Sequence, residues 1–157
     1  MKKTSVPLVI AFTPDYFIPA ATCLYSIITS MQAEGELHVI CLLSEELPER
    51  LKLKIQLIGE GRTCYSFVNL QGKLQHIYID QKYTEAASYR LLLPDLLPEY
   101  KKVIYIDCDI IVRNDLVQLY HSIDLGMNYL AAVFEASMDF QLDHLKTIGC
   151  NPNEYIN

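Results

Sequence analysis

The chain has 157 residues, of which 51% are hydrophobic and 20% charged, so its composition is that of a globular protein about one domain long. Its formal net charge of −6 argues against a nucleic-acid partner, because binding phosphates requires a basic face. No apolar run approaches the roughly 20 residues of a membrane-spanning helix, and the cysteines lack Cys-x-x-Cys spacing, so we expect a cytoplasmic protein with reduced thiols.

Apolar segments alternate with amphipathic segments along the first half of the chain. Residues 6–12, 37–43 and 63–70 are rich in β-branched and aromatic side chains and predict strands. Apolar residues at helical spacing predict helices over residues 19–31 and 48–57. Strands that alternate with helices predict an α/β fold, in which a mostly parallel sheet lies between two helical layers.

The second half of the chain carries weaker signals. We expect a short strand within residues 74–79 and a helix over residues 81–93. Asn114 or Asp115 can cap a short helix that follows it. Residues 129–134 are apolar and aromatic, and they predict the last strand.

Two carboxylates stand at the end of another expected strand. Residues 103–106 form an unbroken apolar run, typical of a strand buried on both faces. Residues two apart on an extended chain point to the same side, so Asp107 and Asp109 can present their oxygens to one point, with Cys108 as a neutral spacer. Such oxygens suit Mg²⁺ or Mn²⁺, and open α/β sheets bind ligands at this edge. The alternative is that one aspartate caps a turn and the other is only solvated.

Several motifs occur in a recognisable order, at residues 10–16, 88–98, 101–112, 128–133 and 154–157. Together they resemble the family 8 glycosyltransferases, which include bacterial lipopolysaccharide galactosyl- and glucosyltransferases and glycogenin. The resemblance implies a three-layer α/β/α GT-A fold. It also implies retaining transfer of galactose or glucose from UDP-galactose or UDP-glucose to a glycan acceptor such as lipopolysaccharide.

The resemblance implies roles for individual positions. Asp107 and Asp109 match the family's metal-binding pair, which holds Mn²⁺ or Mg²⁺ against the donor diphosphate. Glu135 and Asn157 match positions on the sugar and acceptor side, and no catalytic residue is assigned. The positions expected to contact the nucleotide-sugar are Ala11, Phe12, Thr13, Asp15, Tyr16, Arg90, Ile106, Asp107, Cys108 and Asp109.

Physical chemistry is compatible with two of these roles. Tyr16 can stack its ring on a base, and Arg90 can offer a planar fork of donors to phosphate or sugar oxygens. Each residue also has a purely structural alternative. Tyr16 can pack at the edge of the sheet, and Arg90 can pair with Asp95 or Glu85 on its own expected helix.

Members of this family continue well past the motif at residues 154–157. We therefore expect residues 1–157 to be the nucleotide-sugar-binding part of a longer enzyme, whose remainder supplies a third metal ligand, much of the acceptor site and any peripheral membrane association. One alternative is a catalytically inactive nucleotide-sugar-binding fragment. Another is a haloacid-dehalogenase-type phosphatase with Asp107 as the phosphorylated nucleophile. That motif belongs near the start of its domain, whereas most of this chain precedes Asp107.

Overall fold

The computed structural model describes these parts of the chain: residues 5–32, 34–76, 84–133 and 140–151. They form two compact units, the first ending at Ser122 and the second beginning at Ile123. The elements of the first unit, in which η denotes a 3-10 helix, are β1 (Val6–Phe12), η1 (Pro14–Tyr16), α1 (Phe17–Ser30), β2 (Leu37–Leu43), α2 (Glu49–Gln56), β3 (Thr63–Asn69), α3 (Glu85–Ser88), η2 (Tyr89–Leu92), α4 (Leu93–Leu96), β4 (Ile104–Asp107) and α5 (Leu116–Ser122). The second unit contains α6 (Leu142–Ile148).

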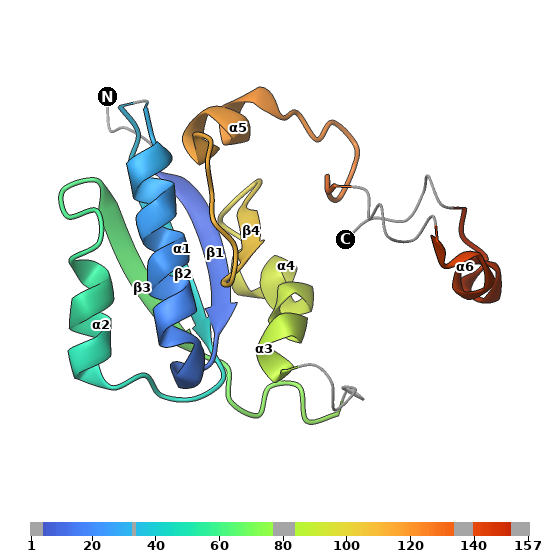
Figure 1. The fold of residues 1–157 in the computed structure, drawn as a ribbon, viewed down its shortest axis with the longest axis horizontal. Coiled ribbons are helices and arrows are strands. Elements are labelled where there is room, and N and C mark those ends of the chain that lie inside the picture. The colour runs from blue at the N-terminus through green and yellow to red at the C-terminus, as the bar shows by residue number, and fades with distance from the viewer. Residues whose placement is uncertain (1–4, 33, 77–83, 134–139, 152–157) are drawn as a thin grey trace. The chain divides into compact units, whose positions relative to one another are not determined.

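The first unit is built on a parallel sheet whose strand order, within the described residues, is β3-β2-β1-β4 (Figure 1). β1 pairs with β2 along its length, and β4 pairs with the other side of β1, where Ala11 lies opposite Asp107. The chain therefore moves away from β1 in one direction for β2 and β3, and in the other direction for β4. The point at which the direction reverses lies between β1 and β4, and open α/β sheets bind their ligands at such a point.

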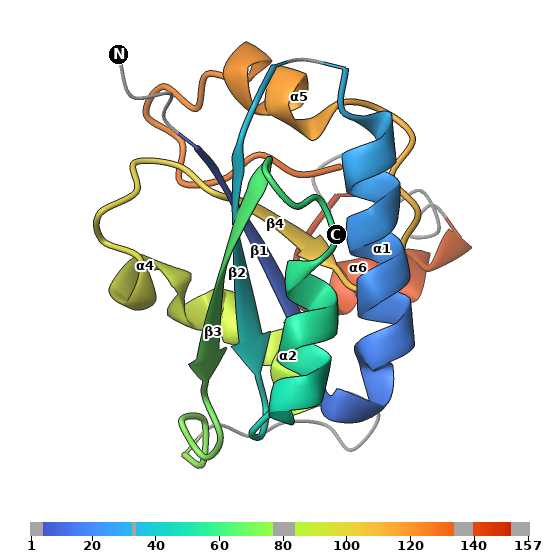
Figure 2. The same ribbon diagram turned by 90° about the vertical axis from the view of Figure 1, so that its left-hand side faces the viewer.

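Helices cover both faces of this sheet, which explains why β1 is apolar and buried at every position. On one face, side chains such as Phe12 and Leu24 join α1, α2 and α5 to the sheet in one core. On the other face, Ile40 and Tyr89 belong to a second core beneath α3, η2 and α4. Figure 2 shows α1 and α2 on one side of the sheet and α4 on the other. The expected three-layer arrangement is confirmed.

The elements expected in the first half of the chain are confirmed, with ends that differ by at most two residues. In α1, Ala20, Leu24 and Ile27 are buried at helical spacing, as the sequence pattern predicted, and Cys23 is buried with them. The expected cap of α5 is also confirmed. Asp115 accepts hydrogen bonds from the backbone N–H groups of the second and third residues of the helix.

The helix expected over residues 81–93 is broken in its described part. The segment runs through three short pieces, α3, η2 and α4, instead of one helix. Pro94 lies at the start of α4. Its ring leaves no room for the carbonyl of Arg90 in a continuous α-helix, and it has no N–H to donate, so the helix has to restart there.

Two expected strands were wrong where they can be checked. Residues 74–76 form a turn, and residues 77–79 lie outside the described residues. Residues 129–133 have no strand conformation, and Phe134 lies outside the described part of the chain. An apolar β-prone segment becomes a strand only where a neighbouring strand completes its hydrogen bonds, and no described strand pairs with either segment.

The second unit contains a helix, α6, that the sequence reading missed. Leu142, Leu145 and Ile148 recur every third residue in it. Gly149, with a φ of 69°, ends the helix, and Cys150 donates its N–H to the carbonyl of Leu145. This hydrogen bond is typical of a Schellman helix end. The helix could have been predicted from the leucines and isoleucine at every third residue, followed directly by a glycine.

Candidate functional site

The expected site residues gather where β1 and β4 end, on the two sides of the sheet's reversal point. β1 leads through Thr13 into η1, and β4 ends at Asp107. Because the two strands are parallel and Ala11 lies opposite Asp107, the loop after Ala11 and the residues after Asp107 emerge at the same edge. Ala11 and Phe12 are buried and Ile106 is half-buried, so the exposed groups come from the loops.

The loop after β1 is a tight turn. Tyr16 donates its backbone N–H to the carbonyl of Thr13 at 2.9 Å, and Pro14 occupies the first position of η1, where its fixed φ suits a helical turn. Asp15 is exposed, and 45% of Tyr16 is accessible to solvent. The turn therefore holds an exposed ring and a carboxylate at the edge where β4 ends.

The two aspartates at the end of β4 do not both have the extended geometry expected from their spacing. β4 ends at Asp107, and Cys108 and Asp109 lie in a turn. The expectation that the Asp107 and Asp109 side chains lie on one side of a strand was therefore wrong. The turn still exposes both carboxylates, because the Cys108 side chain is buried in the core that includes Cys23 of α1.

Cys108 is a neutral spacer, as expected. Burial raises the pKa of its thiol to about 11, and the neighbouring Asp109 and Asp107 carboxylates add to this rise. The thiol of Cys23 lies close by and donates to the carbonyl of Asp107 at 3.8 Å. The turn is thus anchored to α1 by apolar packing and a weak hydrogen bond.

Arg90 lies against Asp107. Its Nη2 donates to Asp107 Oδ1 at 2.8 Å, its Nε donates to the carbonyl of Ala87 at 2.9 Å, and its guanidinium carbon is 4.8 Å from the centre of the Tyr105 ring. The structural alternative of a pair within its own helix was wrong, because the described partner carboxylate is Asp107 on β4. Sequence reasoning missed Tyr105, although a residue two before Asp107 on a strand shares its face.

Asp109 differs from Asp107 in having no hydrogen bond or ion pair among the described residues. Its carboxylate is exposed in the turn. The Asp109 carboxylate, which has no partner within the described part of the chain, and the half-exposed Asp107 carboxylate form a set of hard oxygen donors that suits Mg²⁺ or Mn²⁺. The described residues contain no group of three or more His, Cys, Asp and Glu side chains able to hold a metal.

The segment that leaves Asp109 is fastened along α1. Val112 donates its N–H to Ser26 Oγ at 2.9 Å, Ser30 donates to the carbonyl of Asn114 at 3.2 Å, and Gln32 donates its N–H to Asp115 Oδ2 at 2.9 Å. Helix α1 thus holds both the turn with the aspartates and the chain that follows it. Glu135 and Asn157, expected on the sugar and acceptor side, lie outside the described residues.

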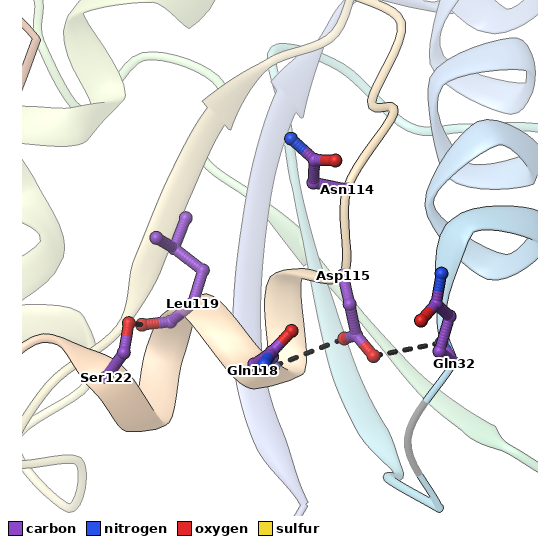
Figure 3. A pocket seen from close by; sticks show the side chains of 6 residues that line it. All are labelled: Gln32, Asn114, Asp115, Gln118, Leu119 and Ser122. Atoms are coloured by element: carbon purple, nitrogen blue, oxygen red, sulfur yellow. Dashed lines mark hydrogen bonds between the residues drawn. The ribbon is translucent and has the colours of Figure 1, made fainter.

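An open hollow of about 450 Å³ lies beyond the C-terminal end of α1 (Figure 3). Its lining residues are Gln32, Asn114, Asp115, Gln118, Leu119 and Ser122. Asp115 is the charged group in it, and both of its oxygens already accept backbone N–H groups. This carboxylate therefore serves the start of α5, and the hollow is separate from the aspartate turn.

Comparison with known proteins identifies the family. The model of glycosyl transferase family 8 matches residues 7–156. The chain belongs to this family. General stress protein A of Bacillus subtilis is 24% identical over 149 residues, which are 92% of this chain and 52% of that protein.

Solved structures agree on the fold of this family 8 chain. The apo structure of the bifunctional glycosyltransferase WbbM superposes with a TM-score of 0.82 at 24% identity, covering 98% of this chain and 30% of that one. The galactosyltransferase LgtC, solved with donor and acceptor sugar analogs, superposes with a TM-score of 0.78 at 23% identity, covering 97% and 55%. The expected GT-A fold is confirmed, and the match argues against the phosphatase alternative.

The chain spans about half the length of General stress protein A and of LgtC. Within its described residues, no helix combines the length and the apolar character that crossing a bilayer requires.

Proposed function

We propose that this chain is the donor-binding part of a retaining glycosyltransferase, which transfers galactose or glucose from a UDP-sugar to a glycan such as lipopolysaccharide. The proposal rests on family membership and on one observation of the site. Asp107 and Asp109 project from the reversal point of the sheet, at the same edge as the exposed turn after β1.

The proposed site would hold Mn²⁺ or Mg²⁺ on Asp107 and Asp109. Breaking the sugar–phosphate bond leaves extra negative charge on UDP, and a bound divalent cation would stabilise that charge as a Lewis acid. Arg90 adds a permanent positive charge beside Asp107. Its planar fork is suited to the oxygens of a diphosphate or sugar.

The turn after β1 would hold the nucleoside. Tyr16 presents an exposed ring on which uracil can stack, and Asp15 and the backbone of Thr13 lie in the same turn. Glu135 and Asn157 remain proposed for the sugar and acceptor side. We assign no catalytic nucleophile or base to the described residues.

Titration of the chain with UDP, with and without Mn²⁺, tests the proposal. We expect binding that requires the metal and that Asp109→Asn weakens by about tenfold or more, since this change removes one of two charged ligands. Asp95→Asn is the matched control, because Asp95 is exposed in the first turn of α4. Binding that is indifferent to Mn²⁺ and to Asp109→Asn would contradict the proposal.

A second candidate is a part that binds donor without turnover. It is favoured by the ligand set of two carboxylates, Asp107 and Asp109, that the described residues offer. Two carboxylates by themselves hold a cation loosely, so this candidate predicts weak UDP binding and very slow transfer or hydrolysis. Metal-dependent UDP binding without release of sugar from a UDP-hexose would support this candidate.

A further inference from the structure

Arg90 is held from three directions at the end of β4. Its Nε donates to the Ala87 carbonyl, its Nη2 donates to Asp107, and its guanidinium lies over the ring of Tyr105. A guanidinium that is stacked on a ring and bonded through two nitrogens has lost much of its freedom before any ligand arrives. Its ion pair with Asp107 is therefore more defined than most surface pairs.

The elements explain why these groups meet. Tyr105 and Asp107 are two residues apart on β4 and share a face, and Tyr105 packs against the core beneath α3, η2 and α4. Arg90 lies in η2, which begins directly after α3, the helix that contains Ala87. The break in the expected helix thus places a cation over the strand that ends in the first aspartate.

The two aspartates consequently differ before a metal binds. Asp107 Oδ1 already accepts a hydrogen bond from a cation, whereas Asp109 has no partner among the described residues. A divalent cation needs the same Asp107 oxygens, and its charge is repelled by a guanidinium in contact with them. The two cations therefore compete for one carboxylate.

We propose that Arg90, held by Tyr105, is a resident counter-cation of Asp107, which a divalent cation must displace from this carboxylate in order to bind. The inference builds on the metal site of the proposed function. It assigns Tyr105 as a positioning residue that acts through Arg90. It also predicts that Arg90 opposes binding of the metal alone, although it carries the charge that would favour a bound diphosphate.

The test measures binding of Mn²⁺ alone to the whole chain, from the electron paramagnetic resonance signal of free Mn²⁺. The Arg90 and Asp107 side chains are 38% and 50% exposed, so water weakens their interaction. We therefore expect Arg90→Met to tighten Mn²⁺ binding by only roughly two- to fivefold. Tyr105→Leu should change affinity in the same direction by less, and Tyr105→Phe, which keeps the ring but loses the hydroxyl that interacts with Arg90, should lie between Tyr105→Leu and the unmodified chain.

Arg113→Met is the matched control for net charge. Arg113 is exposed, lies four residues after Asp109, and has no ion pair with either aspartate among the described residues. Its loss therefore measures the effect of one nearby charge without the contact, and salt screening keeps that effect below the change expected for Arg90→Met. Circular dichroism of each variant verifies that it is folded.

The inference is overturned if Arg90→Met binds Mn²⁺ no more tightly than Arg113→Met, or if neither it nor the unmodified chain binds Mn²⁺. It is also overturned if Tyr105→Leu binds Mn²⁺ no more tightly than the unmodified chain, because Tyr105 would then have no role in holding Arg90. Failure of the proposed function looks different. It would appear as UDP binding by the unmodified chain that does not depend on Mn²⁺, whatever the arginine variants do.

Discussion

Replacing Asp115 with alanine should lower the free energy of unfolding of the first unit by about 2–3 kcal/mol. Asp115 is 9% exposed and is the buried charged residue of the described chain. Its carboxylate connects the start of α5 to the end of α1 (Figure 3). Alanine removes both connections at once.

The magnitude follows from the hydrogen bonds that are lost. Oδ1 accepts the N–H groups of Val117 at 2.8 Å and Gln118 at 3.2 Å, and loss of such a helix cap costs about 1 kcal/mol. Oδ2 accepts the N–H of Gln32 at 2.9 Å, and leaving a partly buried N–H unpaired costs about 1–3 kcal/mol. Water in the adjoining hollow can replace part of this second hydrogen bond, so we expect a total loss of about 2–3 kcal/mol in the free energy of unfolding.

Urea unfolding followed by circular dichroism measures the effect. With a urea dependence of about 1–3 kcal/mol per molar, the midpoint should fall by about 1 M or more. Asp115→Asn keeps the capping oxygen but turns an NH2 group toward the Gln32 N–H, so it should lose about half as much. Asp95→Ala, at an exposed position, controls for the loss of one negative charge.

The reasoning would be refuted by an Asp115→Ala chain no less stable than Asp95→Ala. It would also be refuted if Asp115→Asn were as damaging as Asp115→Ala, because the capping bond to α5 would then contribute nothing.

Two further predictions concern strain and ionisation. Gly59→Ala and Gly61→Ala both place a side chain at a positive φ, 74° and 82°, at a cost of about 1 kcal/mol. The new Cβ at Gly59 would also lie 2.8 Å from Ile28 Cδ1, whereas the one at Gly61 would meet nothing within 4 Å. Urea unfolding should therefore show a free energy of unfolding that is lower by a further 1–3 kcal/mol or so for Gly59→Ala. Equal losses in the two variants would contradict this clash. Burial, helped by nearby Cys108, raises the pKa of Cys23 to about 11, so the unfolded chain loses this proton first and stability should fall as the pH rises from about 9 to 11. Between these pH values the urea midpoint should fall less steeply with pH for Cys23→Ala than for the unmodified chain. An equally steep fall in both would contradict the raised pKa of Cys23.

Local chemistry explains what could be read from the sequence. The strands β1 and β2 have the predicted bounds, because segments that are apolar throughout are stable only where both faces of a sheet are covered. The Asp115 cap could be predicted because a side-chain oxygen just before a helix satisfies free N–H groups of the first turn. These interactions join residues that are close in the chain.

The errors arose where distant segments decide the outcome. Residues 129–133 have the composition of a strand, but no described strand pairs with them. The spacing of Asp107 and Asp109 suggested an extended chain, yet β4 stops at Asp107, and the next side chain is buried against α1. Composition records a preference, whereas hydrogen-bond partners and core contacts decide between a strand and a turn.

The sequence by itself determined the alternation of strands and helices, the position of the aspartates at the end of an apolar run, and the family to which the chain belongs. The tertiary structure alone decided the strand order that brings the turn after β1 beside Asp107, and it alone paired Arg90 with a carboxylate 17 positions away instead of with Glu85 or Asp95. The physical reason is that the local partners of a side chain lie within a few residues of it in the chain, whereas the sheet order and the break at Pro94 set which distant charge it meets.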